Sequence, residues 1–118
     1  FGLLGNYALP QCLVTTTGRE SGQKRTVTLL YGELDGDLIL VGSNFGQKNH
    51  PAWALNLEAD PKATVTIKDL PQEMVARMVT DPDERERIWQ AMSEIWPAYL
   101  AYRGRAGREI KLFALSAA

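Results

Sequence analysis

Short runs of apolar and β-branched residues, bounded by glycine, proline and aspartate, follow one another through the first 80 residues. Such runs predict β-strands over residues 12–17, 26–34, 37–42, 63–67 and 74–80. Asp35-Gly36 separates the second run from the third, and this dipeptide is typical of a tight hairpin because both turn positions require positive φ. The two runs are therefore expected to pair antiparallel. Asp69-Leu70-Pro71 is expected to turn the chain between the last two runs.

Helical signals interrupt and follow these strands. Residues 50–57 predict a short helix with Pro51 in its first turn, ended by Asp60-Pro61. Asp81-Pro82-Asp83-Glu84 predicts the start of a second helix, because it combines a capping carboxylate, a proline at the first helical position and a glutamate at the third.

The apolar face of the second helix recurs at helical spacing and consists of Ile88, Trp89, Met92, Ile95, Trp96, Tyr99 and Leu100. Pro97 should kink or restart the helix, and Gly104 and Gly107 should end it. A last strand is expected over residues 110–115. About six antiparallel strands with two helical insertions predict a mainly β fold, a small barrel that forms one domain over residues 1–118.

Composition and charge exclude several classes of protein. A net charge of −1 gives no general attraction to nucleic acid, so any cationic cluster must act locally on a small ligand. The single Cys12 forms no internal disulfide and suits the cytoplasm. No apolar run approaches the roughly 20 residues of a membrane span, so membrane association would need a segment missing before Phe1. Phe1-Gly2-Leu3-Leu4 is too short for a signal peptide.

The segment from Gly18 to Arg25 carries the strongest chemical signal. It holds two glycines, a serine and three cations between two β-rich runs, and the cations are Arg19, Lys24 and Arg25. Glycines let backbone N–H groups converge on an anion, and guanidinium groups bind phosphate or carboxylate with two hydrogen bonds. The segment is therefore either an anion-binding loop or an ordinary basic β-turn.

Other catalytic signals are sparse. His50 and Cys12 lie far apart in sequence, no Cys/His cluster has the spacing of metal ligands, and the glycine-rich nucleotide-binding motifs are absent. His50 is expected to cap the short helix or to line the wall of a pocket rather than to act as a base. This pattern is typical of proteins in which a bound cofactor supplies the chemistry.

Aromatic residues are the remaining candidates for a pocket. Trp53, Trp89 and Trp96 are expected to lie mainly in the core. For Tyr99 and Tyr102, which lie three residues apart beyond Pro97, a core position and a site position are equally compatible with the sequence.

Two motifs together identify a family resemblance. Residues 13–25, LVTTTGRESGQKR, resemble the TTTGRxSGxxR signature of the deazaflavin-dependent nitroreductase family. Residues 42–57, GSNFGQKNHPAWALNL, resemble its second signature, SNxGxxxHPAWxxNL, and residues 80–85 and 96–102 match its C-terminal half. The resemblance covers residues 13–115 in order and spacing. It implies a split β-barrel of the flavin-binding type and the cofactor coenzyme F-420, a deazaflavin with an anionic phospholactyl and polyglutamate tail.

The resemblance also implies which residues bind the cofactor. The tail would meet Arg19, Glu20, Ser21 and Lys24. The strand beneath the cofactor would be Arg25, Thr26, Val27, Thr28, Leu29 and Leu30. The phosphate side would be Val41, Gly42, Ser43 and Asn44, and the helix packed along the cofactor would be Ala52, Trp53, Ala54, Leu55 and Asn56. Tyr102 would lie near the deazaflavin and Tyr99 near the electron acceptor, as the catalytic pair.

The sequence departs from the family at three positions in or near these motifs. Glu20 stands where a lysine or arginine is frequent, Asn49 where a lysine or histidine is common, and Ala54 where a tyrosine is frequent. Ala54 is expected to open space near the pocket, and Glu20 places a negative charge beside an anionic tail.

The function implied is a cytoplasmic oxidoreductase that passes the hydride of reduced F-420 to a planar, electron-poor small molecule. The family acceptors are quinones, activated enones and nitro compounds. Two alternatives stay open at this point: a barrel of the same kind that binds FMN, and a non-catalytic carrier of a deazaflavin. The sequence does not indicate the oligomeric state.

Overall fold

The computed structural model describes residues 10–118, which form seven β-strands, three α-helices and one short 3-10 helix. The expectation for Phe1–Leu4 lies outside the described residues. None of the helices between residues 10 and 118 has the length and apolar character of a membrane span.

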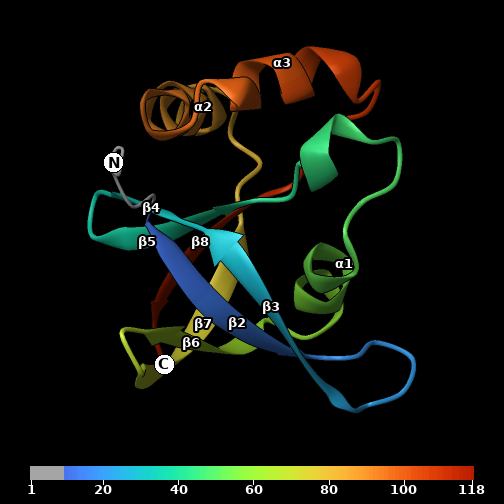
Figure 1. Ribbon diagram of the computed structural model, residues 1–118, viewed down its shortest axis with the longest axis vertical. Helices are drawn as coiled ribbons and strands as arrows, with labels where there is room; N and C mark the ends of the chain where they lie inside the picture. Colours follow the sequence, from blue (N-terminus) through green and yellow to red (C-terminus); the bar gives the residue numbers. More distant parts are fainter. Residues whose placement is uncertain (1–9) are drawn as a thin grey trace.

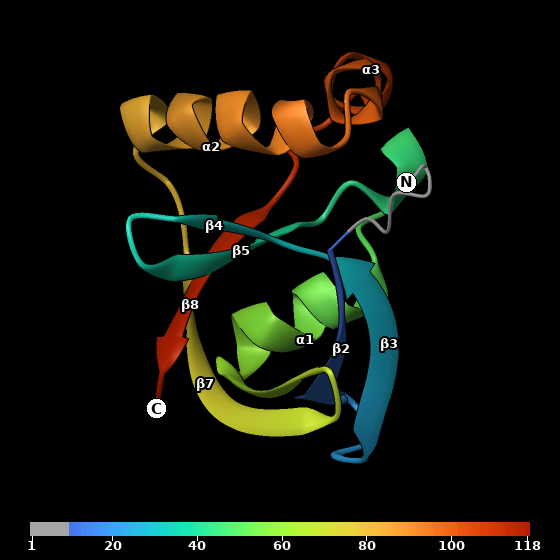
Figure 2. The same cartoon turned by 60° about the vertical axis from the view of Figure 1, so that its left-hand side comes forward.

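All seven strands belong to one antiparallel sheet, whose order is β3-β2-β6-β7-β8-β5-β4. The sheet curls strongly, as Figures 1 and 2 show, and the predicted mainly β barrel with helical insertions is confirmed. Its strands are β2 (Gln11–Thr17), β3 (Lys24–Leu30), β4 (Gly32–Leu34), β5 (Asp37–Val41), β6 (Lys62–Ile67), β7 (Leu70–Met78) and β8 (Leu112–Ala117).

The strand predicted over residues 26–34 is in fact two strands, which lie at the opposite edges of the sheet. β3 pairs with β2, whereas β4 pairs with β5. Tyr31 is the single residue between them, and its N–H donates to the carbonyl of Pro10 at 3.1 Å. The curl of the sheet brings its two edges together, so one bent segment can serve both.

Two turns set the register of neighbouring strands. The predicted hairpin at Asp35 and Gly36 is confirmed, with φ of 54° and 85° at these positions and antiparallel pairing of β4 with β5. The second turn lies at Lys68 and Asp69, earlier than predicted, with φ of 52° and 66°. Pro71 therefore belongs to β7 rather than to a turn. Its strand position costs no hydrogen bond to β8, because β8 pairs with β7 only from Met74 onward.

Helix α1 (Ala52–Ala59) lies inside the curl of the sheet (Figure 2). Pro51 is extended, with ψ of 149°, so it precedes the helix instead of occupying the predicted first turn, and the helix ends at Asp60 as predicted. Trp53 and Leu57 pack from α1 into a core cluster with strand residues that include Phe113. Their burial fixes α1 against the inner face of the barrel.

A second core cluster lies between the outer face of β5 and β8 and the helices α2 (Pro82–Ile95) and α3 (Ala98–Arg105). Residues along β5 alternate between the clusters: Leu40 joins the first, and Ile39 and Val41 join the second. This alternation follows from the two-residue period of a strand that is covered on both faces. Gly32 has no side chain to obstruct Met92, which lets α2 approach β4 closely.

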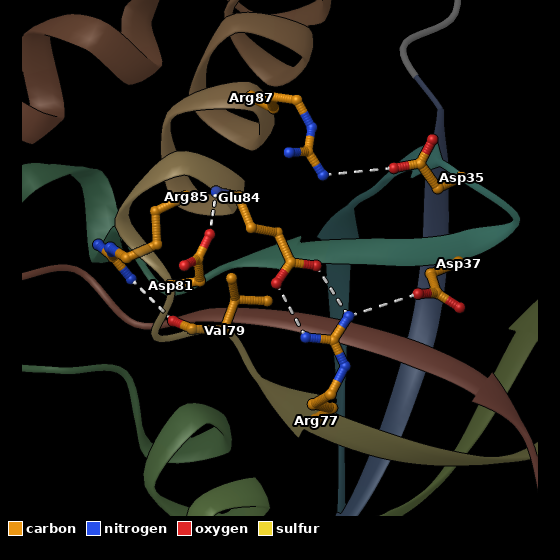
Figure 3. Close-up of polar contacts among 8 residues, drawn as sticks. All are labelled: Asp35, Asp37, Arg77, Val79, Asp81, Glu84, Arg85 and Arg87. Carbon is orange, nitrogen blue, oxygen red and sulfur yellow. Dashed lines mark hydrogen bonds and ion pairs between the residues drawn. The ribbon is translucent and has the colours of Figure 1, made fainter.

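The start of α2 is held to the sheet by polar contacts (Figure 3). Asp81 caps the helix as predicted, its carboxylate accepting the backbone N–H of Glu84 at 2.9 Å. Arg77 of β7 makes a two-point contact with the Glu84 carboxylate at 3.0 and 2.9 Å and also lies 3.7 Å from Asp37. The hydrogen bonds from Arg77 lower the pKa of Glu84 below its ordinary value. These contacts hold α2, which precedes the helix α3 that carries the two candidate tyrosines.

The break predicted at Pro97 is confirmed, since Trp96 is extended between α2 and α3. Two details differ from the prediction. Leu100 is 52% exposed, because the break rotates α3 relative to α2, and Gly104 lies inside α3 rather than ending it. The last strand begins at Leu112, two positions later than predicted, since the residues after α3 lead back to the sheet without strand pairing.

Candidate functional site

The basic loop between β2 and β3 is closed by its own backbone. The N–H of Gly18 donates to the carbonyl of Gln23 at 2.8 Å, and the N–H of Gly22 donates to the carbonyl of Gly18 at 2.9 Å. Gly22 has a φ of +72°, and a side chain at Gly18 would collide with the Ser21 hydroxyl oxygen, 2.7 Å away. The glycines therefore permit a compact turn that Arg19, Glu20 and Ser21 occupy.

Asn56 connects this loop to α1. Its side-chain oxygen accepts the backbone N–H of Arg19 at 3.1 Å, and its side-chain nitrogen donates to the Thr16 hydroxyl at 3.2 Å. The Asn56 side chain is buried, so both of its polar atoms need these partners. The loop and the helix are thus held as one unit.

A cavity of about 450 Å³ opens between the basic loop, β3 and α1. Arg19 and Arg25 place two cations in its lining, and Glu20 places one anion there. No ion pair of these three side chains occurs within residues 10–118. The full lining is Thr16, Gly18, Arg19, Glu20, Ser21, Arg25, Thr26, Val27, Ala52, Trp53 and Asn56.

A second cavity of about 480 Å³ lies beside the first and shares Val27, Ala52 and Trp53 with it. The two cavities are therefore adjacent, and together they are called the groove below: the first is charged and the second is aromatic. The remaining lining of the second cavity is Thr28, Leu29, Leu30, Val41, Ser43, Asn44, Phe45, His50, Pro51, Trp96, Tyr99 and Tyr102.

Tyr99 and Tyr102 face the second cavity from α3, with ring centroids 6.2 Å apart and the rings nearly perpendicular. Tyr99 is 5% exposed and also belongs to the second core cluster. Burial, with a smaller contribution from Tyr102, raises the pKa of Tyr99 to about 12. Tyr99 is therefore a protonated phenol at neutral pH, able to donate a hydrogen bond.

The loop over the second cavity is strained and braced. Asn44, Phe45 and Gly46 have consecutive φ values of 48°, 57° and 77°. Gly46 lies so close to Tyr102 that an added Cβ would be 3.0 Å from the Tyr102 Cα. Arg105 donates to the Phe45 carbonyl at 3.2 Å, and the Phe45 ring meets Tyr102 edge-on. Packing against α3 thus maintains a backbone shape that non-glycine residues rarely adopt.

Most of the residues expected to bind a cofactor line this groove, but four do not. Lys24 donates to the Thr17 hydroxyl at 3.0 Å on the exposed strand, and Leu55 lies outside both linings. Gly42 is buried against Lys111, and Ala54 has no exposed surface. Because Ala54 is buried beside Gly42 and lines neither cavity, its small side chain does not open space in the groove, contrary to the expectation.

The three tryptophans differ in position. Trp89 is 2% exposed, lines neither cavity and packs beneath the Arg103 guanidinium. Trp53 is also buried, as expected, yet it lines both cavities. Trp96, at the break before Pro97, is half-buried: it packs against the second core cluster and also lines the second cavity.

Sequence reasoning missed Arg108, which follows α3. Its guanidinium donates to the carbonyls of several residues in the loop between β5 and α1 and lies 3.0 Å from Nδ1 of His50. His50 lines the second cavity, one of the two positions expected for it. No local signal marks Arg108, because its partners lie about 60 residues earlier in the chain.

Comparison with known proteins places this groove in context. Residues 4–116 match a family model described as F-420H(2)-dependent quinone reductase. The chain is 34% identical to an F-420H(2)-dependent quinone reductase of Mycobacterium tuberculosis over 113 residues, which cover 92% of this chain and 74% of that protein.

Two solved structures are also similar. The first is described as a domain-swapped dimer; it has a TM-score of 0.81 and 35% identity, with 91% of this chain and 80% of that chain covered. The second is the F-420-H2 dependent reductase FDR-A, with a TM-score of 0.80 and 35% identity, covering 91% of this chain and 94% of that chain.

Proposed function

Because the chain belongs to the F-420H(2)-dependent quinone reductase family, we propose that its groove binds reduced coenzyme F-420 and presents it to a planar quinone. Family membership makes the protein an oxidoreductase with coenzyme F-420 as its cofactor. The observation that carries the proposal is the pair of adjacent cavities, of which the first is charged and the second is aromatic.

The residues present fit the cofactor chemically. An anionic tail suits the first cavity, where Arg19 and Arg25 have no ion-pair partner within the described chain and can offer charge-assisted hydrogen bonds. A flat deazaflavin ring suits the second cavity, where Val27, Leu29 and Trp53 supply apolar surface. The tail would be held by Arg19, Ser21 and Arg25, and the ring by the strand and helix residues that line the second cavity.

Reduced F-420, when bound, supplies the hydride. The chain itself would exclude water and fix the acceptor, since the apolar walls and the braced loop over Tyr102 enclose the aromatic end of the groove. Tyr99 is protonated at neutral pH, and burial, which raises its pKa to about 12, moves it further from ionisation, so its hydroxyl can donate to an acceptor oxygen that gains negative charge. Tyr102, half-buried beside it, can do the same from the more exposed position.

The acceptors we propose are quinones first, and then the activated enones and nitro compounds implied by the resemblance to the deazaflavin-dependent nitroreductases. All of these acceptors are planar and electron-poor, which suits the aromatic lining of the second cavity. We also propose a cytoplasmic location. It is supported by the single Cys12, which is buried and unpaired, and whose burial raises the pKa of the thiol to about 11.

The test is a titration of the purified protein with oxidised F-420 and with FMN, followed by turnover of reduced F-420 with a soluble naphthoquinone. The expected result is binding of F-420 in preference to FMN and quinone-dependent oxidation of the reduced cofactor. Preference for FMN would overturn the cofactor assignment to this groove. Binding of F-420 without turnover of quinones, enones or nitro compounds would indicate a carrier instead.

A further inference from the structure

Arg108 is held entirely by protein atoms of the loop that leads from β5 to α1. Its guanidinium donates to the carbonyls of Gly42 and Ser43 at 3.3 and 3.1 Å, and to those of Gln47 and Asn49 at 3.1 Å each. It is half-buried and lines neither the first nor the second cavity. With its donors directed to these carbonyls, Arg108 is suited to shaping the loop rather than to binding a ligand directly.

The remaining contact of Arg108 decides the protonation of His50. Nη1 of Arg108 lies 3.0 Å from Nδ1 of His50. A guanidinium can only donate, so this hydrogen bond requires a lone pair on Nδ1 and places the proton of a neutral imidazole on Nε2. Burial, reinforced by repulsion from Arg108 and Lys111 and opposed by Glu58, lowers the pKa of His50 and favours the neutral ring.

The imidazole lines the second cavity, and Nε2 is the ring nitrogen that Arg108 leaves free. Within residues 10–118, Nε2 has no hydrogen-bond partner. A ring nitrogen that carries a proton is a donor, so His50, as a lining residue of the second cavity, can offer it one N–H group from the side of the loop and α1. The tyrosine hydroxyls lie on α3, a different element of the wall.

The charge of the cavity indicates what this donor would bind. With His50 neutral, none of the described residues that line the second cavity is charged, whereas Arg19, Glu20 and Arg25 line the first. Burying an ionised group without a countercharge is costly, so an uncharged ligand with a carbonyl oxygen suits the second cavity better than an anion. A neutral N–H donor matches such an oxygen without placing a fixed cation beside it.

We propose that His50, held as the Nε2–H tautomer by Arg108, donates a hydrogen bond to a carbonyl oxygen of the electron acceptor. The inference rests on the proposed function. Hydride forms a C–H bond at a carbon conjugated to the acceptor carbonyl, the C=C electron pair shifts toward the carbonyl carbon, and the carbonyl π pair moves to the oxygen, which a proton from water later neutralises. His50 keeps its own proton and stabilises the charge by the hydrogen bond. His50 is thus a substrate-contacting residue, and Arg108 is its positioning residue.

The tautomer can be measured without cofactor, because His50 is the only histidine of the chain. Protein labelled with ¹⁵N-histidine should show one imidazole whose Nδ1 has the chemical shift of an unprotonated nitrogen and whose Nε2 has that of a protonated one. Arg108→Met should give a mixture of tautomers. Arg105→Met is the matched control, because Arg105 also donates to a carbonyl of the loop but does not contact His50. A proton on Nδ1 in the unmutated protein would overturn the inference, and this result needs no variant.

Contact with the acceptor is tested by two substitutions at His50. His50→Asn places an oxygen near the position of Nδ1 and keeps a partner for Arg108, but it removes the Nε2 donor. His50→Gln instead can bring an amide N–H to the position of Nε2. We expect kcat/KM for a naphthoquinone to fall about tenfold in His50→Asn and to recover in part in His50→Gln, while the Kd for oxidised F-420 stays within about twofold.

The failure of the inference and that of the proposed function give different results. Absence of quinone turnover in the unmutated protein would refute the proposed function. Normal kcat/KM in His50→Asn would refute the contact with the acceptor, and a weaker Kd for F-420 would assign the donor to the cofactor instead. Titrating quinone into labelled protein saturated with oxidised F-420 gives a readout without turnover. The Nε2–H signal should shift, and an unchanged signal in a protein that reduces quinones would also overturn the inference.

Discussion

The backbone N–H of Arg19 and the side-chain oxygen of Asn56 lie 3.1 Å apart, and this hydrogen bond joins the basic loop to α1. The two residues are 37 positions apart in sequence and line the same cavity. The contact fixes the backbone from which the Arg19 guanidinium extends, and it fixes that backbone to the helix along which the cofactor is proposed to lie. The proposed sites for the anionic tail and for the ring are therefore held by one unit of loop and helix.

Replacing Asn56 with alanine should weaken both the fold and the site. The variant leaves the Arg19 N–H and the Thr16 hydroxyl without their partner, at a cost of about 1–3 kcal/mol for an unsatisfied buried group. Urea unfolding would measure the loss of stability, and an F-420 titration below the transition would measure the loss of affinity. Asn49→Ala removes an exposed side chain of the same kind and should leave stability unchanged. Equal stability of the two variants would contradict the bridging role of Asn56.

Replacing both Arg19 and Arg25 with alanine should weaken F-420 binding by about tenfold or more, because charge-assisted hydrogen bonds to the tail are lost. Affinity of the unmutated protein should also fall with added salt. Isothermal titration measures both effects. A double variant at the exposed Lys62 and Arg87 changes the net charge equally at a distance from the groove, so it separates local binding from general attraction. Unchanged affinity in the variant that lacks Arg19 and Arg25 would show that the tail binds at a different site.

Replacing Glu20 with lysine should tighten binding, and more so for longer polyglutamate tails. Glu20 lines the first cavity beside two cations, and no ion pair to Lys24 or Arg25 occurs in the part of the chain that the structure describes. Its carboxylate is therefore expected to repel the tail rather than to orient a cation. Titration of short-tailed and long-tailed F-420 shows whether the substitution of Glu20 raises or lowers the affinity. Glu20→Gln isolates the removal of the negative charge, and weaker binding in both variants would show that Glu20 organises the loop.

Phenylalanine at Tyr99 or Tyr102 should leave the affinity for F-420 nearly unchanged, because the aromatic wall remains. Turnover with a quinone should fall by about tenfold or more at one of the two positions if that hydroxyl stabilises charge in the transition state. Steady-state kinetics with matched thermal unfolding would separate catalysis from stability. Normal turnover in both single variants and in the double variant would remove these hydroxyls from the mechanism.

Stability should fall as the pH drops below the ordinary His50 pKa of 6.5. Burial and the neighbouring Arg108 and Lys111 lower the pKa in the folded state, so the unfolded chain binds the proton more readily. The stability that the neutral His50 ring contributes is fully present above pH 6.5, and it is lost as the pH falls toward the lower pKa that His50 has in the folded state. Thermal unfolding between pH 8 and pH 5 measures the effect. The loss of stability at acid pH should be smaller in His50→Asn than in the unmutated protein. Identical pH profiles of stability in the two proteins would contradict this prediction.

The local sequence determined the turns, the helix cap and the helix break of this protein. The hairpin at Asp35-Gly36, the cap at Asp81 and the break at Pro97 follow from backbone preferences of a few neighbouring residues, and all three are present. The two sequence signatures likewise indicated dependence on coenzyme F-420, whereas the family that matches is described by quinone rather than nitro reduction.

Only the tertiary structure decided how distant segments meet. The division of residues 26–34 into β3 and β4 depends on the closure of the sheet, which no local pattern reports. Burial of Ala54 and exposure of Leu100 follow from the packing of α1 and α3. The contact of Arg108 with His50 joins residues 58 positions apart. Turns and caps are set by short-range sterics and hydrogen bonds, whereas edge pairing, burial and the contact of Arg108 with His50 depend on which surfaces come together after the chain has folded.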